Sequence, residues 1–380
     1  MLYTDELDYA LPPELIARNP VHPRDHSRLL VYRRSVDCIE DCLFSDLPQL
    51  LASGDLLVAN DTRVLPAKLT LRKESGGIIT GLFIAELLPG KWRVMLRTRG
   101  RAAPGLRLVV TAERSNACVY LKLLERESEK GQWLVEVSDT RPAYEVLARI
   151  GQVPLPPYIE KARDKSRKTA VNDTECTLPQ AGRQGDWMGD QCCDAESYQT
   201  IYARSAGALA APTAGLHFTP EVFAALTQRQ ILRAFVTLHV GLGTFLPVEA
   251  ATLDKHPMHA ESFMIPRATV ESIRRHKAAQ SRIVLVGTTT VRTLETMAHA
   301  ILDTSRPAED LSGSTNLLIQ PGYVFQLTDA LITNFHLPRS TLLALVGALT
   351  GLSRLKDIYQ HAITRRYRFY SFGDAMLILP

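Results

Sequence analysis

Residues 281–301 read SRIVLVGTTTVRTLETMAHAI, and this stretch decides the fold class. Its four consecutive apolar residues, 283–286, are typical of a short strand. A Gly287-Thr288 turn follows, and a helix is predicted after it. The order strand, turn, helix favours a partly parallel sheet, because parallel strands need a crossover connection. The sequence therefore predicts an α/β domain.

Neighbouring segments support this prediction. Thr219 and Pro220 combine an N-cap residue with a proline at the first helical position, so a helix is expected to about Gln230. Ser340 is a second candidate N-cap. Further elements are predicted at 233–241 (strand), 330–338 (strand and exit loop), 339–351 (buried helix) and 357–369 (amphipathic helix).

Residues 64–153 differ from this pattern, because short β-rich runs alternate there with glycine- or proline-containing turns. A small all-β barrel is the expected form, with a sandwich as the alternative. Residues 1–63 are too few to form a core alone. We therefore predict a mixed α/β main domain built from both chain ends, 1–63 and 154–380, with the barrel inserted. Residues 163–194 are polar and glycine-rich and are expected to form a flexible insertion.

The composition is that of an ordinary globular protein, with 46% apolar and 22% charged residues among 380. The formal net charge of +4 is too small for a polycation that coats nucleic acid. The longest uncharged stretch, 340–353, is shorter than the about 20 apolar residues of a membrane span. The N-terminal residues lack the features of a signal peptide, and the six cysteines form no CxxC pair. We expect a cytoplasmic monomer with reduced thiols and no membrane contact.

Several common enzyme motifs are absent. Residues 241–246 begin like a dinucleotide fingerprint, but leucine replaces the third glycine. The chain has no Walker lysine and no GxSxG elbow. Simple nucleotide-hydrolase and α/β-hydrolase functions therefore lose their best support.

Six polar clusters follow predicted strands or precede helices. Ligands bind at such junctions in open α/β sheets, so six of them together predict one composite pocket, although any single cluster taken alone is better explained as a helix cap or turn. His217, His239, His259 and His336 lie in these clusters, where an imidazole can exchange protons near neutral pH. A metal site is not expected, because no HExxH motif occurs. The clusters are 60–63, 212–217, 239–244, 256–261, 287–290 and 333–336.

Basic residues suggest a nucleic-acid partner. The stretch 91–107 contains six of them and no acidic residue, and its central members are Arg97, Arg99 and Arg101. A phosphate backbone fits such a stripe, although a solvated strand face is the ordinary alternative. The second patch, Arg366, Tyr367 and Arg368, interleaves an aromatic ring with arginines, as in surfaces that stack bases.

Ordered motifs lie along nearly the whole chain, at 15–17, 24–31, 60–64, 211–219, 236–245, 258–261, 286–289, 333–338 and 367–376. Together these motifs resemble the S-adenosylmethionine:tRNA ribosyltransferase-isomerase family of the queuosine pathway. The chain departs from the family pattern at Lys68, where arginine is expected, at Ala208, where serine is expected, and in the length of the 163–194 insertion.

The resemblance implies a mixed α/β domain interrupted by a small β-barrel. It also implies that the ribosyl part of S-adenosylmethionine is transferred and isomerised onto 7-aminomethyl-7-deazaguanine at the tRNA wobble position. Epoxyqueuosine, adenine and methionine are the implied products. S-adenosylmethionine is then a consumed substrate, so no cofactor is expected, and the macromolecular partner is tRNA carrying the precursor base. An RNA-binding protein without transfer activity and a methyltransferase remain alternatives.

The implied reaction needs proton transfer, because the sulfonium acidifies the adjacent C5′ protons and a base must remove one. The candidates are Asp61, His217, His239 and His336. For substrate binding, Arg63 and Arg292 are expected to hold the methionine carboxylate, and Glu261 or Asp374 its ammonium group or the ribose hydroxyls. The other substrate-binding candidates are Thr213, Gly215, Gly241, Gly243, His259, Thr288, Thr289 and Asn334.

Overall fold

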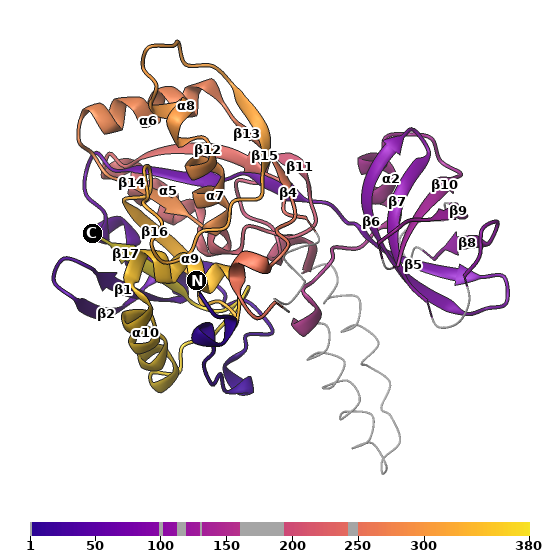
Figure 1. The fold of residues 1–380 in the computed structure, drawn as a ribbon, viewed down its shortest axis with the longest axis horizontal. Coiled ribbons are helices and arrows are strands. Elements are labelled where there is room, and N and C mark those ends of the chain that lie inside the picture. The colour runs from indigo at the N-terminus through magenta and orange to yellow at the C-terminus, as the bar shows by residue number, and fades with distance from the viewer. Residues whose placement is uncertain (1, 99–101, 112–118, 130, 160–193, 242–249) are drawn as a thin grey trace.

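A nine-stranded sheet forms the centre of the main domain (Figure 1). The computed structural model describes residues 2–98, 102–111, 119–129, 131–159, 194–241 and 250–380, so Arg99, Arg101, Gly243 and nearly all of the 163–194 insertion lie outside the described residues. In sheet order the strands are β15 (Leu311–Thr315), β13 (Glu261–Ile265), β12 (Leu232–Leu238), β3 (Leu56–Asn60), β14 (Ile283–Val286), β16 (Ala330–Asn334), β17 (Ala375–Leu379), β1 (Arg28–Arg33) and β2 (Cys38–Leu43).

The predicted parallel core is confirmed. Strands β12, β3, β14 and β16 run parallel, whereas β13 and β17 pair antiparallel with the two outer members of this group. Strand β1 then pairs parallel with β17. The carboxyl ends of the four parallel strands therefore share one edge of the sheet with the amino ends of β13, β17 and β1. This edge is called the sheet edge below.

Apolar side chains of the parallel strands alternate between two buried cores. Leu57 and Ala59 face the core formed with α1 (Leu47–Leu50) and α5 (Pro220–Gln228). Leu56 and Val58 face the opposite core. That core packs against α6 (Arg267–Ala278), α7 (Thr288–Thr296), α8 (Ala298–Leu302), α9 (Thr341–Thr350) and α10 (Leu352–Thr364). Helices on both faces explain why the strand sequences are continuously apolar, since each buried aliphatic side chain contributes about 1.5–3 kcal/mol.

The predicted helix starts are confirmed by their capping hydrogen bonds. Thr219 Oγ1 accepts from the Val222 amide at 3.3 Å, and Ser340 Oγ accepts from the Leu343 amide at 3.2 Å. Two helices differ from the sequence prediction. The amphipathic helix predicted at 357–369 is α10 (Leu352–Thr364), which begins and ends five residues earlier. The segment after β14 is divided at Met297 into α7 and α8. The Met297 amide bonds the carbonyl of Leu294, three residues back, so the last turn tightens and the helix ends.

A closed six-stranded barrel occupies the predicted insertion and excludes the sandwich alternative. Figure 1 shows the barrel beside the main α/β domain. The unit is not all-β, however, because α2 (Ala143–Ile150) packs Val146 and Leu147 into the barrel core. In order around the barrel the strands are β10 (Gln132–Val137), β7 (Lys91–Arg97), β6 (Ile78–Leu88), β5 (Lys68–Lys73), β8 (Arg107–Val110) and β9 (Tyr120–Arg126).

A small parallel pair of strands, β4 (Thr62–Val64) and β11 (Ser205–Ala208), flanks the insertion on both sides. Because β4 begins two residues after β3 ends, this pair connects the barrel to the sheet edge. None of the described helices combines the length and apolar character needed to cross a membrane.

Candidate active site

Asn60, the last residue of β3, ties together three elements at the sheet edge. Its side-chain Oδ1 accepts from the amides of Leu238 and Thr62 at 3.0 and 3.1 Å. Its Nδ2 donates to the Leu238 carbonyl at 3.0 Å and to Thr289 Oγ1 at 3.3 Å. The buried amide therefore fixes the exits of β3 and β12 relative to the first turn of α7.

Asp61 and His239 directly follow the ends of the neighbouring parallel strands β3 and β12, and they lie close together beside Asn60. Asp61 Oδ1 accepts from Thr237 Oγ1 at 2.7 Å, and burial raises the pKa of this carboxyl group. Burial lowers the pKa of His239, and the charge of Asp61 opposes that shift. His239 Nδ1 contacts Thr62 Oγ1 at 2.8 Å, and the ring is only partly buried. A neutral His239 next to a carboxylate has the properties of a proton acceptor near pH 7.

Two glycines make room for aromatic rings in and near this pair, Gly207 for His239 and Gly215 for Tyr202, and neither contact could be predicted from the sequence. A Cβ atom on Gly207 in β11 would lie 2.7 Å from the His239 ring. A Cβ on Gly215 would lie 2.0 Å from the Tyr202 hydroxyl, which is buried and has no hydrogen-bond partner among the described residues. The charge of Asp61 adds to burial in raising the pKa of Tyr202. The position of the His239 ring thus depends on a glycine in the neighbouring strand.

His217 lies farther along the edge, in the short 3-10 helix η5 (Thr213–His217), against the end of β16. Its Nδ1 contacts Ser27 Oγ at 2.7 Å, and its Nε2 contacts Asn334 Nδ2 at 3.2 Å. Thr213 Oγ1 donates to Asn334 Oδ1 at 2.7 Å. Burial, with smaller effects from the charges of Arg368 and Arg24, lowers the pKa of His217 to about 3. Both ring nitrogens have protein partners, which favours a positioning role over proton transfer.

His336 belongs to the opposite face of the sheet. Its Nε2 contacts Thr333 Oγ1 at 2.8 Å, and its amide donates to the Tyr359 hydroxyl of α10 at 2.9 Å. Burial lowers the pKa of His336 to about 4. The four predicted acid–base residues are therefore distributed over three positions, and only Asp61 and His239 form a pair.

Three candidates for substrate contacts are already engaged in the fold. Arg292 forms a buried ion pair with Glu261 and donates through Nε to the Leu317 carbonyl at 3.0 Å. Glu261 Oε1 also accepts from the Gly241 amide at 3.1 Å. Asp374 accepts the backbone amides of Arg28 and Arg368 at 3.0 and 2.7 Å, and burial raises its pKa. These side chains hold the sheet edge together in this structure.

The remaining substrate-binding candidates are less engaged in contacts within the fold. Thr288 and Thr289 occupy the first turn of α7, where Gly287 turns the chain with a φ of +84°. Arg63 on β4 and His259 before β13 are exposed. No group of three or more His, Cys, Asp or Glu side chains in the described part of the chain is placed to hold a metal ion.

The predicted base-stacking role of Tyr367 is wrong. Its side chain is fully buried, its hydroxyl donates to Asp41, and the Arg28 guanidinium lies 3.7 Å from the ring centre. A base therefore has no access to the ring. Arg368 is bound to backbone carbonyls, including that of Phe372 at 2.7 Å, whereas Arg366 is exposed.

Comparisons with known proteins place the chain in a family. A model of the family described as "Queuosine biosynthesis protein" matches residues 4–378. The chain is 43% identical over 378 residues to a protein of Thermosynechococcus vestitus named S-adenosylmethionine:tRNA ribosyltransferase-isomerase, covering 99% of this chain and 96% of that protein. A Thermotoga maritima protein of the same name is 43% identical over 376 residues, covering 98% and 99%.

A solved structure agrees with these relationships. The crystal structure of an S-adenosylmethionine tRNA ribosyltransferase from Thermotoga maritima is 34% identical with a TM-score of 0.52, covering 98% of this chain and 100% of that one. The family match and the near-complete coverage of the relatives agree with the fold described above. The chain belongs to the family of queuosine biosynthesis proteins.

Proposed function

We propose that the protein transfers and isomerises the ribosyl part of S-adenosylmethionine onto 7-aminomethyl-7-deazaguanine at the wobble position of tRNA. The products are epoxyqueuosine in tRNA, adenine and methionine. One observation carries the proposal: relatives named for a ribosyltransferase-isomerase activity match this chain at 43% identity over almost its whole length. S-adenosylmethionine is consumed as a substrate in this scheme, so no resident cofactor is required.

The Asp61–His239 pair suits the first step. The positive sulfur acidifies the C5′ protons of S-adenosylmethionine, and a neutral imidazole takes one of them to leave an ylide. Because Thr62 occupies Nδ1, the proton goes to Nε2 of His239. The nearby Asp61 carboxylate stabilises the resulting imidazolium. Adenine then leaves the ribose, the amine of the base attacks, and epoxide closure expels methionine.

Substrate positioning completes the proposal. Arg63 is favoured over Arg292 for the methionine carboxylate, because Arg63 is exposed and Arg292 is paired with Glu261. The hydroxyls of Thr288 and Thr289 are proposed to bind the nucleoside, next to Asn60. Holding two substrates in a reactive geometry contributes about 7–11 kcal/mol to lowering a barrier, so these residues rival the acid–base pair in importance.

Product analysis tests the proposed function. The protein is incubated with S-adenosylmethionine and tRNA carrying the precursor base, and the small-molecule products are separated by chromatography. Free adenine and methionine are the expected result. S-adenosylhomocysteine would instead indicate methyl transfer, and the absence of both products would indicate an RNA-binding protein without transfer activity.

A further inference from the structure

The positive charge of the chain is concentrated in the barrel insertion. Residues 64–153 contain 15 Lys and Arg against nine Asp and Glu, a net +6. The whole chain carries +4, so all other residues together carry −2. An anionic partner is therefore attracted to the barrel rather than to the main α/β domain.

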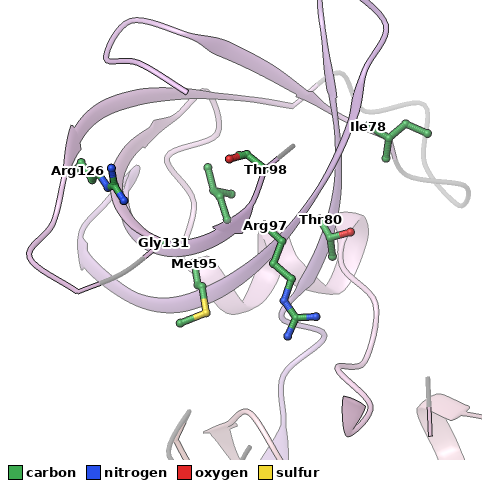
Figure 2. Close-up of a pocket in the computed structure, with 8 residues that line it drawn as sticks. Ile78, Thr80, Met95, Arg97, Thr98, Arg126 and Gly131 are labelled. Atoms are coloured by element: carbon green, nitrogen blue, oxygen red, sulfur yellow. The ribbon is translucent and has the colours of Figure 1, made fainter. Parts of the chain in front are cut away.

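The barrel surface has a hollow of about 760 Å³ where β6 and β7 meet the turn between β9 and β10 (Figure 2). This volume lies within the roughly 300–1,000 Å³ range of sites that hold a small ligand. Its lining residues are Ile78, Thr80, Met95, Leu96, Arg97, Thr98, Arg126 and Gly131.

The lining combines free positive charge with apolar surface. Arg97 and Arg126 are exposed, and neither forms an ion pair with a described acidic residue. Their neighbour Arg93 differs, because it is paired with Glu127 at 2.6 Å. Figure 2 shows Met95 and Arg97 pointing the same way from β7, as residues two apart on a strand do. Thr80 lies directly across from Arg97 in the β6–β7 pairing.

We propose that this hollow binds an unpaired nucleotide of the tRNA substrate. Arg97 and Arg126 contact phosphates, and the base lies against Met95. An RNA duplex presents phosphates but hides its base faces, whereas an unpaired nucleotide offers both a phosphate and an apolar face. The inference rests on the proposed function for the identity of the RNA.

The chain provides a matched control outside the hollow, since Arg107 is not among its lining residues. Arg107 lies on β8, three strands away from β7 in the closed six-stranded order. It is exposed, and its guanidinium lies 4.2 Å from the Tyr120 ring centre. Neutralising Arg107 removes the same charge from the barrel without altering the hollow, which separates local binding from general electrostatic attraction.

The test measures binding of tRNA carrying the precursor base, by fluorescence anisotropy between 50 and 300 mM salt. Arg97→Gln/Arg126→Gln is expected to reduce the slope of log affinity against log salt by about 1.4–1.8, since each lost phosphate contact removes roughly 0.7–0.9. Affinity at 150 mM salt should fall roughly tenfold. Thr80→Glu, which places a negative charge beside Arg97, should weaken binding in the same direction. Arg107→Gln should change the slope by clearly less.

Two results would overturn the proposal: wild-type affinity and slope in the double variant, or equal losses in the double variant and in Arg107→Gln. The second result would assign binding to the overall charge of the barrel. Adenine release is measured in parallel on the wild-type protein. If adenine is released but the hollow variants bind normally, only this inference fails; if the wild type releases no adenine, the proposed function fails.

Discussion

The sheet edge and the barrel hollow use similar polar side chains in opposite ways. Arg292 at the edge is buried and paired with Glu261, whereas Arg97 in the hollow is exposed and has no described acidic partner. Side chains at the edge bond to one another and hold a fixed geometry, while those of the hollow are open to an incoming ligand. The comparison separates a part of the molecule suited to chemistry from one suited to recognition.

The largest effect is expected from removing the proton acceptor at the edge. His239→Gln should lower kcat for adenine release by roughly 10²–10⁴-fold, the usual contribution of a general base. The tRNA affinity should stay at the wild-type value, because His239 does not line the hollow. His299→Gln, an exposed histidine of α8, is the matched control. Wild-type kcat in His239→Gln would remove this residue from the chemistry.

A smaller loss should follow from moving the same ring without removing it. Gly207→Ala places a methyl group 2.7 Å from the His239 ring and must displace it. A displacement near 1 Å costs about 100-fold in rate. Gly77→Ala is the control, since its new Cβ would contact only Lys73 at 3.8 Å. Equal kcat values in the two variants would show that the ring position does not matter.

The pH dependence of stability tests the second edge cluster. An unfolded histidine binds a proton near pH 6.5, but His217 in the folded protein does so only near pH 3. Acidification between these values therefore favours unfolding. By pH 4 this group should have cost about 3 kcal/mol relative to neutral pH.

His217→Gln should lose correspondingly less stability than the wild type between pH 6.5 and 4, measured by urea unfolding. His299→Gln again serves as the control. Parallel stability curves for His217→Gln and the wild type would mean that His217 is not held neutral by burial.

The smallest effect concerns the apolar part of the hollow. Met95→Ala should raise KM for tRNA by a few-fold, because it removes apolar contact with a base. The salt slope should keep its wild-type value, since no charge changes. A changed slope with unchanged KM would contradict the assigned roles of Met95 and the arginines.

Local sequence signals predicted much of the fold. The helix starts at Thr219 and Ser340 are set by hydrogen bonds to residues three positions further along the chain. The strand–turn–helix pattern after Arg282 is likewise formed by residues that are close together in the sequence. Helix α2 also has a local signal, because Pro142 precedes apolar residues at helical spacing. The β-rich runs that precede α2 mask this signal in the sequence.

Contacts between segments that are far apart in the chain could not be predicted from the sequence. Ser27 contacts His217 across 190 positions, and Tyr367 is engaged by Asp41 across 326. Nothing near Gly207 in the sequence indicates that the His239 ring lies against it. The shared edge of the parallel strands could be predicted from topology. The distribution of the four acid–base candidates over three positions could not, because it depends on where the side chains lie in the folded protein. That the six clusters line one pocket stays a prediction.

Deuterium release from S-adenosylmethionine labelled at C5′ tests the role of the Asp61–His239 pair most directly. With tRNA carrying the precursor base, the wild-type protein is predicted to release deuterium into water, and His239→Gln should release it at least 100-fold more slowly. Release at the wild-type rate from His239→Gln would contradict the account.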